Sequence, residues 1–245
     1  MPYYGPDQAQ IHHTRFGDLA ADAARLLIER LHAMELTEGH VTDLGCGSGI
    51  LAAALIAAGY AVTGVDISSD MIGLARANAP VGSFTVGSVH DVTLASSVGV
   101  TATGEVLNYA TDPRAGLDAF RSLAARVFEV LAPGGVFLLD VATPGRNLGA
   151  NPRHVFHDHQ TWMLGMHATE DGILLDRRIV ILVREPDGRY RRVDEHHELV
   201  LYAVPDVVSA LESVGFSLDV RPSYTTATAS TPASGWAVFV ATKPS

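Results

Sequence analysis

The glycine-rich segment at residues 43–49, which reads Asp-Leu-Gly-Cys-Gly-Ser-Gly, constrains the fold of this chain more than any other feature. An apolar run at residues 41–44 leads into it, and a second apolar segment at residues 50–58 follows it. Glycines between a strand and a helix let backbone amides approach a ligand that any Cβ atom would exclude. The spacing is G-x-G-x-G, whereas the dinucleotide fingerprint is G-x-G-x-x-G. The segment therefore predicts a strand, turn and helix that bind a nucleotide.

Short apolar runs alternate with helical segments through the first part of the chain. The predicted strands lie at residues 41–44, 61–65, 84–86, 100–103 and 136–141, and the predicted helices at residues 50–58, 69–79 and 115–131. This alternation is typical of βαβ units, so we expect these strands to be parallel in one sheet. Upstream, Asp18 is expected to cap an amphipathic helix, and residues 1–36 are expected to form an N-terminal lid.

The pattern changes after Pro144. Longer strands are predicted at residues 162–167, 173–184 and 190–202, with glycine-containing turns between them. They indicate an antiparallel β insert at residues 152–203, placed after the fifth strand and acting as a cap. A predicted helix at residues 206–214 and strands at residues 216–224 and 236–242 complete the chain. We expect residues 1–245 to form a single domain.

The charge balance argues against a nucleic-acid substrate. The net charge is -10 with 17 Lys and Arg residues, and phosphate binding requires a basic face. No apolar run is long enough to cross a bilayer, and the N-terminus lacks the basic and apolar regions of a signal peptide. We therefore expect a cytoplasmic protein that has no membrane partner and is a monomer or homodimer.

The sequence does not predict a metal site. Cys46 is the only cysteine, so an internal disulfide or a thiolate zinc site is excluded. His154, His157, Asp158 and His159 are close in sequence, but in an extended segment Asp158 points away from His157 and His159. We interpret these histidines as loop residues.

Asp66 ends the apolar run at residues 60–65, at the carboxyl edge of the next predicted strand. A carboxylate at this position can accept hydrogen bonds from both hydroxyls of a ribose. The alternative is a turn aspartate that caps the helix after Ser68 and Ser69. We favour the ribose role because Asp66 follows the glycine-rich segment by one βα unit.

Residues 41–49, residues 65–68 and Met71 together resemble the class I S-adenosylmethionine-dependent methyltransferases. The resemblance implies an α/β, Rossmann-like, doubly wound fold with a seven-stranded, mostly parallel sheet whose last strand is antiparallel. It implies S-adenosylmethionine as the cofactor, with Gly45 and Gly47 beside the methionine portion, Asp66 on the ribose and Met71 near the adenine. It also implies cofactor contacts from Asp43, Cys46, Ile67, Ser88, Val89 and Thr103.

Two positions depart from the pattern of that family. Where the family often has an acidic residue that reads the adenine amine, this chain offers either Ser88 or Asp91. The predicted fourth strand lacks the usual acidic residue at its start. After that strand, where the family faces the methyl-donor end, Glu105 and Asn108 are site candidates. The alternatives are a solvated loop carboxylate and a helix cap.

The acceptor site is expected between the N-terminal segment and the insert, because ligands of open α/β sheets bind beyond the carboxyl ends of the strands. In the predicted strand at residues 190–202, Glu195 and His197 share one face and His196 and Glu198 share the other. One pair is expected to face the cavity; the alternative is a salt-bridged sheet on a wet face. Further candidates for the same surface are Trp162, Arg177 and Tyr202.

The candidates for catalysis are His197, His12, Glu195 and Glu105. Histidine titrates near neutral pH, so His197 or His12 is expected to remove a proton or orient the substrate. An exposed loop histidine is the alternative for His12 and His13. The predicted function is methyl transfer from S-adenosylmethionine to an oxygen, nitrogen or carbon of a small molecule. The alternatives are a catalytically silent cofactor-binding or interaction module and an NAD(P)-dependent oxidoreductase.

Overall fold

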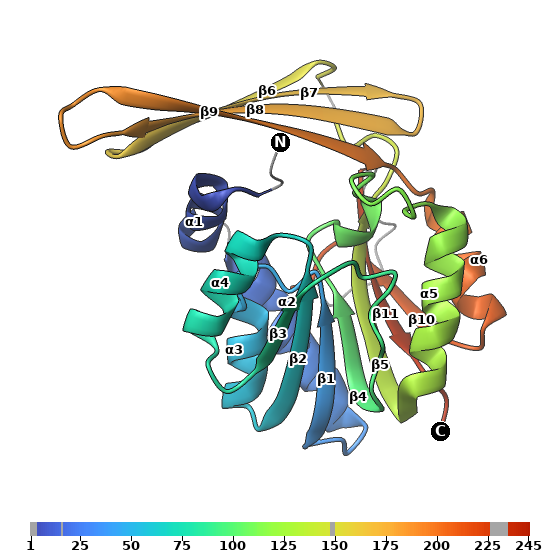
Figure 1. The fold of residues 1–245 in the computed structure, drawn as a ribbon. Helices are drawn as coiled ribbons and strands as arrows, with labels where there is room; N and C mark the ends of the chain where they lie inside the picture. Colours follow the sequence, from blue (N-terminus) through green and yellow to red (C-terminus); the bar gives the residue numbers. More distant parts are fainter. Residues whose placement is uncertain (1–3, 16, 148–149, 226–234) are drawn as a thin grey trace.

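The computed structural model describes residues 4–15, 17–147, 150–225 and 235–245. A seven-stranded sheet with helices on both faces carries a separate four-stranded antiparallel sheet (Figure 1). The predicted α/β fold with an antiparallel insert is therefore confirmed. Among the described residues, no helix is long and apolar enough to cross a membrane.

The large sheet has the strand order β10-β11-β5-β4-β1-β2-β3. Strands β1 to β5 are mutually parallel, whereas β11 is antiparallel to both of its neighbours, β5 and β10. The expected parallel strands and the antiparallel last strand are thus all present. The strands are β1 (Gly39–Leu44), β2 (Tyr60–Asp66), β3 (Ser83–Val86), β4 (Ser97–Ala102), β5 (Leu131–Ala142), β10 (Ser217–Arg221) and β11 (Trp236–Thr242).

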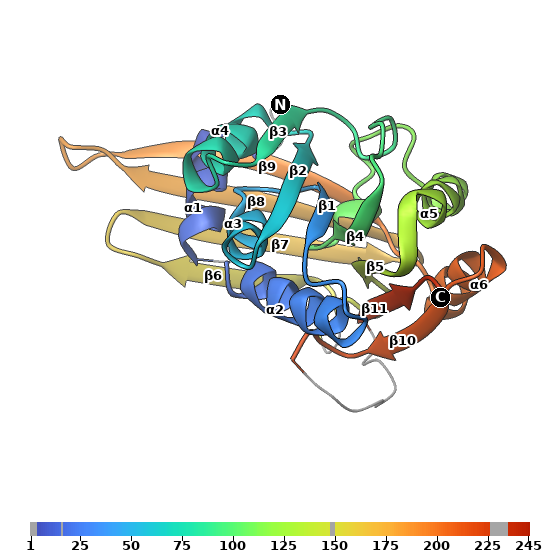
Figure 2. The same cartoon turned by 90° about the horizontal axis from the view of Figure 1, so that it is seen from below.

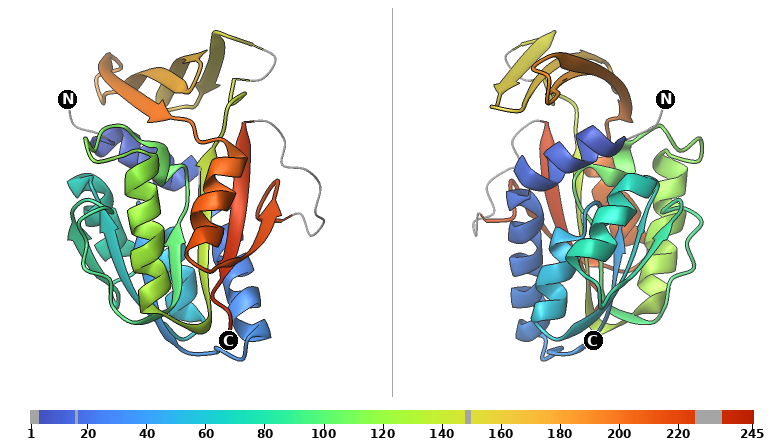
Figure 3. Two further views of the ribbon diagram at one scale, coloured as in Figure 1. Left: turned by 90° about the vertical axis from the view of Figure 1, so that its right-hand side faces the viewer. Right: turned by 60° about the vertical axis from the view of Figure 1, so that its left-hand side comes forward.

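Helices cover both faces of this sheet (Figures 2 and 3). One layer contains α2 (Asp18–Ala33), α3 (Ile50–Ala57) and α4 (Ser69–Asn78), and the other contains α5 (Leu117–Val130) and α6 (Val204–Ser213). Successive side chains of a strand point to opposite faces. Accordingly, Val136 and Leu138 of β5 pack with the α2 layer, whereas Phe137 and Leu139 pack with the α5 layer.

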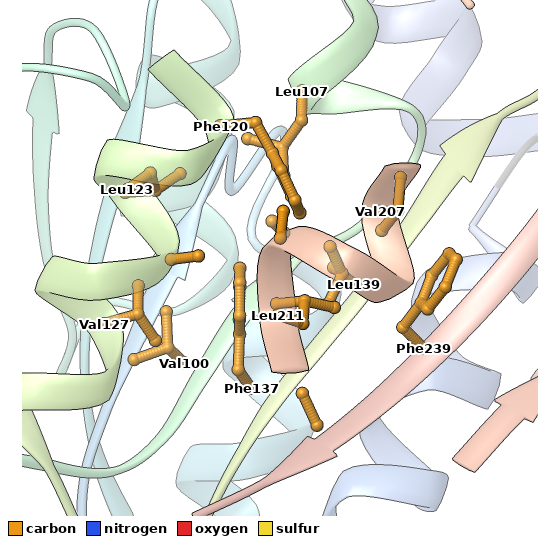
Figure 4. Packing of buried hydrophobic residues seen from close by; sticks show 14 of the residues in the cluster. Val100, Leu107, Phe120, Leu123, Val127, Phe137, Leu139, Val207, Leu211 and Phe239 are labelled. Atoms are coloured by element: carbon orange, nitrogen blue, oxygen red, sulfur yellow. The ribbon is translucent and has the colours of Figure 1, made fainter. Parts of the chain in front are cut away.

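The core beneath α5 and α6 is closely packed. Phe120 of α5 and Leu211 of α6 lie over Phe137 and Leu139 of β5, and all four side chains are fully buried (Figure 4). Close packing makes such a core resist deformation. The carboxyl ends of β4 and β5 are therefore held on a rigid base.

The second sheet, which we call the cap sheet, has the strand order β6-β7-β8-β9. It lies across the carboxyl ends of the parallel strands, and helix α1 (Pro6–Arg15) lies between it and α4 (Figures 1 and 3). Because α1 and the cap sheet come from distant parts of the chain, only the folded molecule brings them together. The strands are β6 (Arg153–Asp158), β7 (Trp162–Asp171), β8 (Leu174–Arg184) and β9 (Tyr190–Val200).

The structure differs from the prediction at two elements and one cap. Helix α1 is mostly polar and buries Gln8 as well as apolar residues between cap and core, a pattern without helical periodicity. Strand β6 pairs only with β7 and leaves Phe156 67% exposed, so its sequence lacks the alternation of a half-buried strand. The predicted cap of α2 is wrong by one residue. Gly17 occupies the cap position, where no side chain accepts a hydrogen bond, and Asp18 is the first helical residue.

Candidate functional site

Two neighbouring hollows lie at the carboxyl ends of β1, β2 and β4. The first is bordered by the glycine turn, the end of β2 and residues 87–90. The second, of about 590 Å³, is bordered by the glycine turn, α1 and the inner face of the cap sheet. A volume of this size suits a small ligand. The hollows meet at shared residues, which we call the junction: Tyr4, His12, Gly45, Gly47, Thr103, Gly104 and Tyr109.

The glycine turn uses left-handed backbone at three positions, with φ of 70° at Gly45, 50° at Gly47 and 75° at Gly49. A Cβ atom at Gly45 would lie 2.1 Å from Val106 Cγ2, and one at Gly49 would lie 2.9 Å from Ala75 Cα. A Cβ atom at Gly47 would meet nothing within 4 Å. Packing therefore requires the outer two glycines, whereas Gly47 presents bare backbone to the open hollow.

Asp66 is held by backbone groups at the edge of the first hollow. Its Oδ2 accepts a hydrogen bond from Gly47 N at 2.9 Å, and its Oδ1 accepts one from Ser68 N at 2.9 Å. Burial raises the pKa of Asp66, although these backbone donors oppose the rise. Ser68 is the cap of α4, because its Oγ accepts from Met71 N at 3.2 Å. The helix-cap alternative for Asp66 is therefore wrong.

Apolar side chains form the wall of the first hollow next to Asp66. Ile67, Met71 and Val89 all line it. Met71 is buried, but Ile67 is 46% exposed, an unusual exposure for a large apolar side chain. A flat apolar ligand surface would cover Ile67 and remove it from water.

Of the two alternatives after β3, the structure brings Ser88 into the first hollow and leaves Asp91 outside. Ser88 Oγ donates to Asp112 Oδ2 and accepts from His90 N at 3.0 Å, whereas Asp91 forms an ion pair with Arg114 on the outside. Asp112, which also lines the hollow, was not identified from the sequence. It lies in a stretch without a motif, and only the fold brings it beside Ser88.

Asp43 and Cys46 border the second hollow and not the first, whereas Thr103 belongs to the junction. Asp43 Oδ1 accepts from Thr101 Oγ1 at 2.7 Å, and its Oδ2 has no partner among the described residues. Burial raises the pKa of Asp43 to about 7. Burial likewise raises the pKa of the Cys46 thiol, so this thiol is not a nucleophile at neutral pH.

Glu105 is buried between two arginines. Arg146 Nε donates to its Oε1 at 2.6 Å, and Arg177 Nη1 donates to its Oε2 at 2.6 Å. Burial disfavours the charge, but the two guanidinium groups outweigh burial and hold the pKa of Glu105 below its usual range. The solvated-loop alternative is therefore wrong. Because such a carboxylate is a poor proton acceptor, we assign it to charge pairing and not to base catalysis.

The loop that carries Glu105 is shaped by a buried carboxylate at the end of β5. Asp140 accepts hydrogen bonds from Gly104 N at 2.7 Å and from Glu105 N at 2.6 Å, and also from the Tyr224 hydroxyl. Glu105 itself has a left-handed φ of 62°. Strained backbone of this kind persists only where its surroundings determine it. Asp140 supplies those surroundings.

His197 and Glu195 of β9 face the core, as the alternation along the strand predicts. His197 Nε2 lies 2.9 Å from Glu195 Oε2, and both side chains are buried. Glu195 also accepts hydrogen bonds from Tyr4 N at 3.1 Å and Gly5 N at 2.9 Å. Glu195 therefore attaches the N-terminal segment to the cap, and it orients His197.

His197 lies beside the junction. Its ring centroid is 5.1 Å from that of Tyr4 and 5.8 Å from that of Tyr109, and the hydroxyls of these tyrosines are 3.1 Å apart. His197 lines the second hollow only, whereas both tyrosines line both hollows. Neither tyrosine belongs to a motif, so sequence reasoning missed them.

His12 is helical and belongs to the junction, so the loop alternative is wrong. Burial, together with the neighbouring His13 and His197, lowers the pKa of His12 from 6.5 to about 4. At neutral pH His12 is therefore uncharged and a weak base. His13 is also helical, and its Nδ1 lies 3.0 Å from Ser48 Oγ in the glycine turn.

Several other candidates have structural roles. Asn108 Nδ2 donates to Ala142 O at 2.9 Å and to Val200 O at 2.7 Å, which joins the ends of β5 and β9. Tyr202 donates to Leu107 O at 3.0 Å in the core and does not belong to the cap. Asn108 is thus neither a helix cap nor a residue of the two hollows. Of Trp162, Arg177 and Tyr202, which were expected to share the acceptor surface, only Arg177 lines the second hollow.

Among the described residues, the histidines considered for a metal belong to no group of three close potential ligands. His154 and His157 lie on β6, so their assignment to a loop is wrong, and His157 lines the second hollow. Within the described ranges, the one group of three close potential metal ligands is Asp176, His196 and Glu198, on the outer face of the cap sheet.

Comparisons with known proteins agree with this geometry. Residues 42–139 match the family described as a methyltransferase domain. A provisionally named methyltransferase of Geobacillus sp. (strain WCH70) is 27% identical over 199 residues, which cover 76% of this chain and 77% of that protein.

Solved structures share the fold over nearly the whole chain. An S-adenosylmethionine-dependent methyltransferase from Clostridium acetobutylicum ATCC 824 has a TM-score of 0.83 and 18% identity, covering 97% of this chain and 98% of its own. The S-adenosylmethionine-bound amino pentose methyltransferase CalS10 from Micromonospora echinaspora, involved in calicheamicin biosynthesis, has a TM-score of 0.73 and 20% identity, covering 99% and 98%.

Proposed function

Because this chain belongs to the class I S-adenosylmethionine-dependent methyltransferases and uses S-adenosylmethionine as its methyl donor, we propose that it methylates a small molecule in the second hollow. The observation that carries the proposal is the junction, where a hollow beneath the cap sheet meets the hollow of the glycine turn. The family match argues against the alternative of an NAD(P)-dependent oxidoreductase, and transfer of label from S-adenosylmethionine distinguishes an enzyme from a silent module.

The residues of the first hollow fit the donor. The bare backbone at Gly47, the Asp66 carboxylate and the exposed Ile67 side chain would hold its nucleoside. Next to the glycine turn, at the border of the second hollow, Oδ2 of Asp43 has no partner among the described residues and is an acceptor that suits an ammonium group. When bound, S-adenosylmethionine supplies an electrophilic methyl group on a sulfonium.

The second hollow would orient the acceptor and exclude water from it. Methyl transfer is an in-line displacement, so alignment of the nucleophile is the main contribution of the protein. Residues of the cap sheet and α1 form the walls of this hollow opposite the glycine turn. The amino pentose methyltransferase with the same fold acts on a small molecule, which supports a small acceptor here.

We assign His197 as the residue that takes a proton from the acceptor. The His197 ring lines the second hollow, a histidine titrates near neutral pH, and Glu195 accepts a hydrogen bond from its Nε2–H. Glu195 is then a positioning residue. The weak basicity of His12 and the ion pairs of Glu105 make both less suitable.

The test of a small acceptor uses the purified protein with methyl-labelled S-adenosylmethionine. A cell extract is separated into an ultrafiltrate of small molecules and a retentate of macromolecules, and each fraction is incubated with the protein and the labelled donor. We expect labelled products, separated from the donor, in the ultrafiltrate only. Label confined to proteins or nucleic acids of the retentate would overturn the proposal.

The test of His197 compares His197→Gln with His196→Gln, its neighbour on the outer face of β9. With the identified acceptor, we expect kcat to fall about 10²- to 10⁴-fold in His197→Gln only, the usual contribution of a general base. Binding of S-adenosylhomocysteine should be retained in both. An unchanged kcat and pH profile in His197→Gln would refute the assignment.

A further inference from the structure

The walls of the second hollow carry an excess of positive charge in a chain whose net charge is -10. Four arginines line it: Arg15, Arg146, Arg153 and Arg177. Its carboxylates are Glu105, which pairs with two of these arginines, the exposed Asp18, and Asp43, whose pKa burial raises to about 7. A concave surface lined by one sign of charge concentrates ligands of the opposite sign.

Two of these arginines are not neutralised. Arg15 ends α1 and Arg153 begins β6, and within the ranges that the structure describes neither side chain has an ion-pair or hydrogen-bond partner. By contrast, Arg146 and Arg177 share the single charge of Glu105, and Arg146 also lies 4.9 Å from the Trp236 ring centroid. The hollow thus has guanidinium groups available to a ligand.

A buried amide provides a second, independent pointer. Asn147 is 7% exposed and lines the hollow, and its Nδ2 donor has no partner among the described residues. A buried donor without an acceptor costs free energy, so a ligand oxygen at this position would be favoured. Asn147 directly follows Arg146 in the chain, which places amide and guanidinium donors on one loop.

The remaining wall is apolar. Leu164 and Met166 of β7 and Ile179 of β8 point from the cap sheet into the hollow, on the same face as Arg177. The side chains of β6 also alternate in direction, although its sequence does not alternate between apolar and polar residues. Arg153, Val155 and His157 line the hollow, while Phe156 is exposed on the other face. The inner face of the cap thus combines cationic groups with an apolar surface.

We propose that the acceptor is an organic anion, in which a carboxylate or phosphate bound by Arg15, Arg153 and the Asn147 amide is attached to an apolar body. This inference rests on the proposed function of the second hollow as the acceptor site. The arginines hold the charged end of the substrate, and the apolar wall of the cap covers its body. They therefore determine specificity without taking part in the chemical step.

The experiment measures binding by calorimetry to the full chain saturated with S-adenosylhomocysteine. The probes are phenylacetate, phenyl phosphate and the neutral isostere phenylacetamide. We expect at least one anion to bind about tenfold more tightly than the amide, the ratio that one charge-assisted hydrogen bond supplies. Added salt should weaken the binding of the anions and leave the binding of phenylacetamide unchanged. The tighter anion identifies carboxylate or phosphate as the preferred group.

The matched variants are Arg153→Met and Arg178→Met, two exposed arginines of the cap sheet of which only Arg153 lines the hollow. We expect Arg153→Met to lose the preference for the anion about tenfold, as expected for one lost charged contact, while its binding of phenylacetamide is unchanged. Arg178→Met should bind all probes as the unmodified chain does. Equal binding of acid and amide, or equal losses in both variants, would overturn the inference.

The outcome separates this inference from the proposed function. Label transfer to neutral small molecules alone would overturn the anion inference and leave the proposed function standing. Anion binding that depends on Arg153, with label found only in macromolecules, would overturn the small-molecule function and leave the anion site standing.

Discussion

Arg177 of the cap sheet donates two hydrogen bonds to the buried carboxylate of Glu105 in the core, at 2.6 and 3.2 Å. The two residues are 72 positions apart in the chain, and no motif connects them. Their ion pair joins β8 to the loop after β4, so it fixes the cap over the junction. Glu105 was expected to act on the substrate, but its carboxylate pairs with arginines of the protein and holds the cap sheet to the core.

Glu105→Gln should destabilise the folded protein by about 3–5 kcal/mol, the usual cost of removing one partner of a buried ion pair. The substitution leaves Arg146 and Arg177 without their counter-charge. Urea unfolding followed by circular dichroism measures the change. The control is Asp118→Asn, which breaks an exposed pair with Arg121 and should cost about 0–1 kcal/mol. Equal stability of the two variants would contradict the buried role of Glu105.

Gly47→Ala should abolish cofactor binding, whereas Gly172→Ala should retain it. Both glycines have left-handed φ, 50° and 59°, and at both a Cβ atom would meet nothing within 4 Å. Each substitution should therefore cost a similar 1–2 kcal/mol or so of backbone strain. Only Gly47 lines the hollows. Calorimetric titration with S-adenosylhomocysteine checks this, and similar affinities in the two variants would show that the Gly47 backbone does not contact the cofactor.

Asp66→Asn should weaken the binding of S-adenosylhomocysteine about 10- to 100-fold, because hydrogen bonds to a charged group contribute about 1.5–3 kcal/mol. The carboxylate is already oriented by Gly47 N and Ser68 N. Asp70→Asn, in the first turn of α4 and outside both hollows, is the control and should bind nearly as tightly as the unmodified chain. The assignment of Asp66 to the ribose fails if the two variants have equal affinity.

The folded protein should lose stability as the pH falls from 6.5 toward 4, in part through His12. Burial, with a smaller contribution from His13 and His197, lowers the pKa of His12 to about 4. Below pH 6.5 the unfolded chain takes up a proton that the folded chain excludes, so acid favours unfolding and neutral pH favours folding.

His12→Asn should therefore make the melting temperature less dependent on pH in this window. The control is His32→Asn, which replaces an exposed residue of α2. This substitution should leave the dependence of the melting temperature on pH unchanged. Melting curves recorded at several pH values test the difference. Parallel slopes for the two variants would show that His12 is not excluded from protonation in the folded state.

The sheet and the glycine turn were largely predictable, because their signals are local. The apolar runs around residues 41–44 and 136–141 form β1 and β5, and the glycine turn follows directly from its spacing. The alternation in β9 also correctly placed His197 and Glu195 on one buried face. In each case a few consecutive residues carry the pattern, since strand periodicity and turn geometry depend on neighbours in the chain.

The sequence alone therefore predicted the parallel strands and the cofactor turn, and its resemblance to a known family indicated the methyl donor. The tertiary structure decided that polar α1 is a helix, that Glu105 pairs with arginines, and that Tyr4, Tyr109 and Asp112 reach the hollows. Burial of α1 between cap and core and attraction between charges 72 positions apart act through space. Such interactions leave no periodic pattern along the chain, so they could be identified only in the folded structure.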